Sequence, residues 1–115
     1  MLERRRTTRL KEANEVAITV ISDRNNLPKE KRIYGHSKEV WASGAKIQTN
    51  ILLPVDTFLK VNFTLNTLQK KIKAVGKVKW VKVIIDDESY EAGVEFIAPS
   101  RKLANYIAWK HNSIS

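Results

Sequence analysis

A long run of alternating side chains in the second half of the chain constrains the fold most. The run covers Lys70–Ile85. One of its faces carries Ile72, Ala74, Gly76, Val78 and Trp80, and the other carries Lys71, Lys73, Lys77 and Lys79. Because successive side chains of a β-strand point to opposite faces of the sheet, this period of two predicts a long antiparallel strand with one face toward a core. We expect any bend in this strand at Gly76, which has no side chain.

Shorter segments with the same alternation precede and follow this run. They lie at Asn14–Ser22, Arg32–Tyr34, Lys38–Ala42, Ala45–Thr49, Phe58–Leu65 and Tyr90–Ile97. Their content of β-branched and aromatic residues favours strands. Gly35 and the Ser43-Gly44 pair separate three of them, and each predicts a tight turn or a bulge. The acidic segment Asp86–Ser89 predicts the turn of a hairpin between the last two strands.

The period changes after Pro99. Leu103, Tyr106, Ile107 and Lys110 recur at helical spacing, while Arg101, Lys102 and Asn105 face away from them. This spacing predicts one helix over residues 100–111. Several short strands followed by one helix predict an all-β domain with one C-terminal helix, either an antiparallel barrel or a strongly curled sheet, with the helix packed over one end.

Composition excludes several classes of function. A chain of 115 residues is expected to form one domain. The absence of cysteine excludes disulfides, cysteine-ligated metal sites and thiol nucleophiles. The two histidines, His36 and His111, are too few for a metal cluster without carboxylates. Because neither a Ser/His/Asp order nor a glycine-rich phosphate loop is present, we expect a binding protein with no catalytic residues and no cofactor.

The apolar runs of the sequence are short. The longest of them, such as Val81–Ile85, fall far below the roughly 20 residues that a transmembrane helix requires. The N-terminal residues also lack the apolar centre of a signal peptide. We therefore expect a cytoplasmic protein without a membrane span.

Positive charge is concentrated near the N-terminus of a chain whose formal net charge is +9. The first twelve residues contain Arg4, Arg5, Arg6 and Arg9 and few strongly apolar residues, so we expect a flexible arm without a core face of its own. Guanidinium groups bind phosphate in a bidentate manner and stack on purines. The arm therefore predicts a phosphate-bearing partner, although a basic solubilising tail gives the same composition.

Three sequence segments, in this order, together resemble one known family. They are ERRRTTRL at 3–10, EVWASGAKI at 39–47, and GKVKWVKV at 76–83 followed by YEAGVEFI at 90–97. This combination is similar to a PilZ domain. The resemblance implies a six-stranded antiparallel barrel with a C-terminal helix over residues 13–115, preceded by the arm at 1–12. It also implies binding of the bacterial second messenger cyclic di-GMP through an RxxxR motif and a [D/N]xSxxG motif.

The family motifs map onto named positions of this sequence. Arg5 and Arg9 supply RxxxR, and Arg4 and Arg6 add basic neighbours. In the second motif, Glu39 replaces the Asp or Asn that reads a guanine edge, Trp41 replaces the Ser that supports a phosphate or base contact, and Gly44 is retained. A glutamate still accepts hydrogen bonds from guanine N–H groups. An indole donates through its N–H or stacks on a base.

Each candidate residue also has a purely structural interpretation. Glu39 either reads guanine, pairs with Arg5 or Arg9, or is an exposed strand carboxylate. Trp41 either stacks on the ligand or packs at the core or rim. For Gly44 we expect a requirement of backbone geometry in either case. The lysine face of the long strand either follows a nucleic-acid backbone or is a solvated outer face.

The resemblance therefore leads to a ranked set of functional expectations. The first is a receptor or adaptor that binds cyclic di-GMP and converts this binding into contact with an unidentified effector protein. The second is an adaptor of the same fold that has lost nucleotide binding and acts through protein contacts. The third and weakest is a nucleic-acid-binding barrel that uses the lysine strand.

Overall fold

The computed structural model describes residues 10–11, 13–22, 32–65, 70–86, 88–98 and 100–114. Its elements are β1 (Asn14–Ser22), β2 (Ile33–Trp41), β3 (Gly44–Thr49), β4 (Phe58–Leu65), β5 (Lys70–Ile85), β6 (Ser89–Phe96) and α1 (Arg101–Ile114). The expected all-β domain with one C-terminal helix is confirmed.

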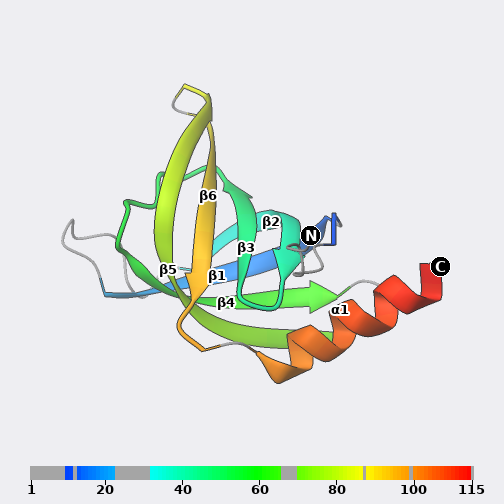
Figure 1. Cartoon of the computed structure of the whole chain (residues 1–115). Coiled ribbons are helices and arrows are strands. Elements are labelled where there is room, and N and C mark those ends of the chain that lie inside the picture. Colours follow the sequence, from blue (N-terminus) through cyan, green and yellow to red (C-terminus); the bar gives the residue numbers. More distant parts are fainter. Residues whose placement is uncertain are drawn as a thin grey trace, which may run out of the picture.

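The six strands form a closed antiparallel barrel in the order β1-β2-β3-β6-β5-β4 (Figure 1). The first strand closes the barrel, because β1 pairs with β2 on one edge and with β4 on the other. In this closing pair, Val16 lies opposite Phe63 and Ile18 lies opposite Val61. Closure leaves the apolar faces of all six strands pointing at one interior.

Alternation along the strands fills this interior. In β4, Leu59, Val61, Phe63 and Leu65 are all fully buried, as expected for a half-buried strand. The Phe63 ring meets the Phe96 ring of β6 edge-on, with 6.1 Å between centroids. This is a favourable geometry for two aromatic quadrupoles.

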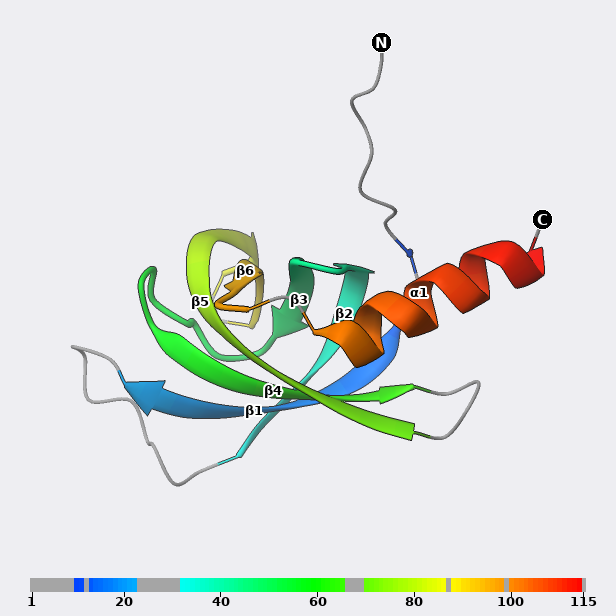
Figure 2. The same ribbon diagram turned by 60° about the horizontal axis from the view of Figure 1, so that its bottom comes forward.

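The helix α1 lies across one end of the barrel (Figure 2). The Ser100 hydroxyl accepts a hydrogen bond from the Leu103 backbone N–H at 3.1 Å, which is an N-cap interaction. Leu103, Tyr106 and Ile107 are buried, so the predicted apolar stripe is the face that packs. Among the described residues, no helix has the length and apolar content needed to span a lipid bilayer.

The predicted interruption at Gly35 is wrong, because β2 runs through it as one strand. Gly35 pairs with Val16 on one side and with Thr49 on the other. A Cβ atom at this position would collide with the backbone carbonyl of Gln48, so the glycine permits close approach of two strands and forms no turn. The irregularity in β2 lies further along, where the register with β3 shifts between Ser37 and Glu39.

The predicted orientation of Trp80 is also wrong. Ile72, Ala74, Gly76 and Val78 lie on the buried face of β5, but Trp80 is 41% exposed. The register between β5 and β6 shifts between Val78 and Trp80, which marks a β-bulge. One extra residue reverses the facing of the side chains up to the next register shift, between Val83 and Ile85, so Trp80 points outward.

Candidate functional site

The arginine motif precedes the first described residue. Arg4, Arg5, Arg6 and Arg9 lie outside the described residues, so their placement remains a prediction. Leu10, which follows Arg9 directly, is described.

Leu10 forms a two-bond antiparallel bridge with Val40 of β2. The Leu10 N–H donates to the Val40 carbonyl at 2.8 Å, and the Val40 N–H donates to the Leu10 carbonyl at 2.9 Å. The Leu10 side chain is only 6% exposed and belongs to the core. The expectation that the first twelve residues contribute nothing to the core is therefore wrong at Leu10.

The bridge lies inside the second motif. Val40 stands between Glu39 and Trp41, the two positions that depart from the family pattern. These residues end β2, and Ala42 and Ser43 form the turn into β3. The Ser43 carbonyl accepts the Phe96 N–H at 2.9 Å, so the turn is also fixed to β6.

Gly44 is required by the close packing of this turn. It lies opposite Trp41 in β2 and Glu95 in β6. A Cβ atom there would come within 2.6 Å of the Val94 carbonyl and 2.9 Å of the Trp41 ring. Any other residue would displace backbone or indole, so a structural requirement accounts for this glycine.

Glu39 is a buried carboxylate, which excludes the exposed-carboxylate interpretation. The residue is 8% exposed, and its Oε1 lies 4.0 Å from the Nζ of Lys46 on the neighbouring strand. A carboxylate taken out of water requires partners that compensate for lost hydration. Glu39 is therefore held beside the Leu10 bridge in an orientation that the fold determines.

A second tryptophan, which the sequence did not predict for this site, lies near Trp41. Trp41, Ser43, Lys79, Trp80 and Gly93 line a cavity of about 180 Å³. The Trp80 indole lies directly over Gly93, where a side chain would collide with the ring. Two indoles therefore border the cavity above the β2–β3 turn.

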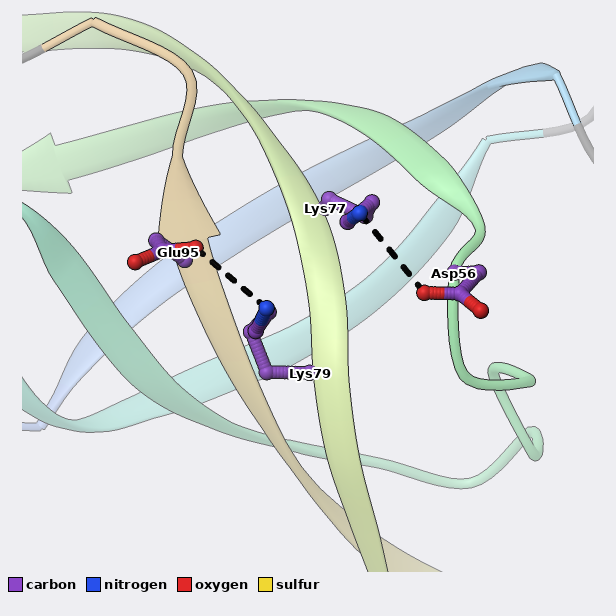
Figure 3. Close-up of polar contacts among 4 residues, drawn as sticks. All are labelled: Asp56, Lys77, Lys79 and Glu95. Atoms are coloured by element: carbon purple, nitrogen blue, oxygen red, sulfur yellow. Dashed lines mark ion pairs between the residues drawn. The ribbon is translucent and has the colours of Figure 1, made fainter.

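Two of the four lysines on the predicted lysine face form ion pairs. The Lys79 Nζ lies 3.6 Å from Glu95 Oε1, and the Lys77 Nζ lies 3.7 Å from Asp56 Oδ1. Figure 3 shows these pairs on opposite sides of β5. Lys71 and Lys73 are exposed and have no ion pair within the described residues. The four lysines therefore do not form one uniform cationic row.

A larger cavity lies elsewhere, on the outer faces of β1, β2 and β3. It measures about 650 Å³, and its lining includes Glu15, Tyr34, His36 and Gln48. Of the predicted ligand residues, none that the structure describes lines it. In the part of the chain that the structure describes, no group of three or more His, Cys, Asp or Glu side chains is arranged to hold a metal ion. The β2–β3 turn remains the candidate site, because the second motif lies there and Leu10, which follows the first motif in sequence, is bridged to Val40 beside it.

Solved structures share this fold at low sequence identity. The inhibitor of motility from Bacillus subtilis (MotI/DgrA) matches with a TM-score of 0.73 and 15% identity, over 97% of this chain and 53% of that one. The PilZ domain of YcgR from Escherichia coli, solved with c-di-GMP, matches with a TM-score of 0.64 and 10% identity, over 92% and 87%. MrkH of K. pneumonia, solved as a c-di-GMP complex, matches with a TM-score of 0.65 and 19% identity, over 98% and 53%.

The present chain thus spans about half the length of the MotI and MrkH chains. A search of curated protein sequences gives no match. The family model for the PilZ domain, by contrast, matches residues 3–109. This match extends from the arginine arm into the C-terminal helix and agrees with the barrel described above. The chain belongs to the PilZ domain family.

Proposed function

We propose that this protein is a cyclic di-GMP receptor of the adaptor type, which converts binding of the nucleotide into contact with an effector protein. The observation that carries this proposal is the Leu10–Val40 bridge. Because consecutive Cα atoms are only about 3.8 Å apart, the bridge keeps the end of RxxxR close to Glu39 and Trp41. We place the receptor in the bacterial cytoplasm, since its ligand is a bacterial second messenger.

The arginines are assigned to the phosphates and the guanine faces. Arg5 and Arg9 match the motif, and Arg4 and Arg6 add positive charge that attracts a dianion. Guanidinium groups also match the O6 and N7 acceptors of guanine. The residues of the arm lose conformational freedom when they close on the ligand, so binding orders the arm and alters the surface offered to an effector.

Glu39 and the tryptophans are assigned to the guanine base. The Glu39 carboxylate can accept from the N1–H and the exocyclic N–H of guanine. The Lys46 ammonium lies 4.0 Å from this carboxylate and keeps positive charge beside the base-binding group. Trp41, with Trp80 across the cavity, offers an aromatic face in place of the missing serine hydroxyl.

Two relatives with this fold were solved with c-di-GMP, and a third is described as an inhibitor of motility. These proteins support a receptor or adaptor role for this chain. A test by isothermal titration with cyclic di-GMP should give one saturable binding event. Arg9→Ala should reduce the affinity at least tenfold, since a lost charge-assisted contact costs about 1.5–3 kcal/mol.

Arg32→Ala is the matched control, because Arg32 is an exposed arginine outside both motifs. It should leave the affinity within about twofold of the parent. Absence of heat at tens of micromolar ligand would contradict the receptor proposal. An Arg9→Ala variant with unchanged affinity would remove Arg9 from the site.

The Glu39 and Trp41 departures favour the second candidate, an adaptor without nucleotide binding. The double variant Glu39→Asp with Trp41→Ser restores the family pattern and separates the two candidates. If Trp41 stacks on a base, this variant binds more weakly than the parent. If the parent gives no binding heat with cyclic di-GMP and the double variant binds it, the parent has lost nucleotide binding. A steep salt dependence on oligonucleotides would instead favour nucleic-acid binding.

A further inference from the structure

The outer half of β5 has a strand neighbour on one edge only. Pairing between β4 and β5 ends at Lys77, and Val78 then exchanges hydrogen bonds with Asp56 and Thr57. Pairing between β5 and β6 continues to Ile85. Beyond Val78, no residue that the structure describes forms a backbone hydrogen bond to the other edge of β5. Figure 1 shows the β5–β6 hairpin projecting from the barrel at this point.

This open edge carries large apolar side chains on both faces. Trp80 is 41% exposed, Val83 51%, Ile84 43% and Ile85 52%. Trp80 and Val83 lie on opposite faces, because they are three positions apart in a stretch without a register shift. Monomeric proteins protect such edges with prolines, closely spaced charges, β-bulges or short strands. Here Lys82 is the lone charge between Trp80 and Ile85, no proline is present, and one shift of the register with β6 lies between Val83 and Ile85.

We propose that this edge binds a second copy of the chain, so that the outer halves of two β5 strands form an antiparallel pair across a two-fold axis. A strand edge is self-complementary under such an axis, since each copy supplies the same donors and acceptors in reverse order. Each of the other strands has a strand neighbour on both edges, although β1 pairs with β4 alone beyond Ile18. The pairing therefore extends two closed barrels into one continuous sheet.

The charges on the hairpin favour this antiparallel arrangement. Lys79 and Lys82 lie toward its base, whereas Asp86 and Glu88 lie at its tip. Antiparallel pairing brings the basic part of one copy toward the acidic tip of the other. Parallel pairing would place like charges together, which is destabilising.

The same argument limits the register. Directly opposed residues of an antiparallel pair share a face, so the two-fold axis must place one residue opposite its own copy. A register centred on Lys82 would oppose two ammonium groups. A register centred on Val83 opposes two apolar side chains and places Lys82 opposite Ile84. A register centred on Ile84 also opposes two apolar side chains, and it places Lys82 opposite Asp86 of the acidic tip. We therefore infer that either Val83 or Ile84 lies on the axis.

Cysteine cross-linking tests this register directly, because the chain contains no cysteine. Opposed Cβ atoms lie about 4.5–5.5 Å apart, which is near the geometry that a disulfide requires. Either Val83→Cys or Ile84→Cys should form a covalent dimer under oxidised glutathione, which takes up the electrons of the two thiols. Val55→Cys is the matched control, because Val55 is also 51% exposed but lies in a loop.

Association should also appear in the unmodified chain. Light scattering in about 0.15 M salt, from about 10 to 500 µM protein, should show a concentration-dependent rise from monomer toward dimer, because so small an interface binds weakly. Val83→Lys should weaken this association at least tenfold, whereas Val55→Lys should not change it. Circular dichroism and thermal unfolding verify that both variants fold.

Two outcomes would overturn the proposal. One is a chain that remains monomeric over the whole concentration range. The other is that neither Val83→Cys nor Ile84→Cys cross-links faster than Val55→Cys. All measurements are made without nucleotide, so their result is independent of whether the protein binds cyclic di-GMP.

Discussion

The two halves of β5 have similar alternating sequences but different surroundings. In the inner half, β4 lies along one edge and β6 pairs with the other from Gly76 onward, and Ile72 and Ala74 are buried. In the outer half, β6 is the one strand neighbour, and Val83 and Ile84 are exposed. The bulge between Val78 and Trp80 separates the two environments. A period-two sequence therefore determines that a segment is a strand, whereas its neighbours determine whether its apolar face reaches a core.

Isoleucine-to-alanine substitutions in the two halves of β5 should give the largest difference in unfolding free energy. Ile72→Ala should lower the free energy of unfolding by about 2–5 kcal/mol, because it removes methyl groups from a packed interior and leaves a cavity. Ile84→Ala should change it by no more than about 0.5 kcal/mol. Denaturant unfolding at low micromolar protein, where the monomer dominates, measures both values. Equal losses of unfolding free energy would show that Ile84 is packed as tightly as Ile72.

Glycine-to-alanine substitutions at Gly76, in the inner half of β5, and at Gly93, beside its outer half, should give a smaller difference in unfolding free energy. At Gly76 a new Cβ atom would lie 2.6 Å from Val94 Cγ1 and 2.8 Å from the Glu95 carbonyl, so Gly76→Ala should cost about 1–3 kcal/mol. At Gly93 the obstacle is the exposed Trp80 ring, which can rotate away. Gly93→Ala should therefore cost less than about 1 kcal/mol but change tryptophan fluorescence.

The matched control for Gly93→Ala is the same substitution in a Trp80→Ala background. Removing the indole removes the obstacle, so the second substitution should then be close to neutral. A persistent cost in this background would show that Gly93 is required by the backbone and that contact with Trp80 is irrelevant.

Removal of the two ion pairs on β5 should change the unfolding free energy least. Double-mutant cycles for Lys77 with Asp56 and for Lys79 with Glu95 should each yield about 0.2–1 kcal/mol, since all four side chains are at least one-third exposed. The Lys77 pair joins the inner half of β5 to a loop, and the Lys79 pair joins the two strands of the hairpin. Both coupling energies should fall in about 1 M salt, and values that do not change would contradict a screened surface interaction.

Much of the fold could be predicted because it depends on local periodicity. The bounds of β1, β4 and β5 agree with the segments read from alternation, and the helix ends within a few residues of its predicted end. Gly35 and Trp80 were assigned wrongly for a shared reason. The conformation at Gly35 depends on how closely a neighbouring strand approaches, and the facing of Trp80 depends on a bulge. Neither feature is visible in the side-chain period.

The candidate site was only partly predictable. Gly44 and Glu39 were identified from motif spacing, but the burial of Glu39 depends on how β2 packs against β3 and the Leu10 segment. Trp80 was missed because its expected place was the core. The glycine opposite it, Gly93, was the available signal, since a strand glycine often marks a close approach.

Barrel closure by β1 also has a consequence for folding kinetics. β4 with β5 and β5 with β6 are neighbours in sequence, whereas β1 must find β4 across more than half of the barrel sequence, as the pairing of Val16 with Phe63 shows. Long-range pairing requires loop entropy to be lost before contacts form, and it slows folding. We therefore expect the β1–β4 seam to form late, with substitutions there chiefly accelerating unfolding.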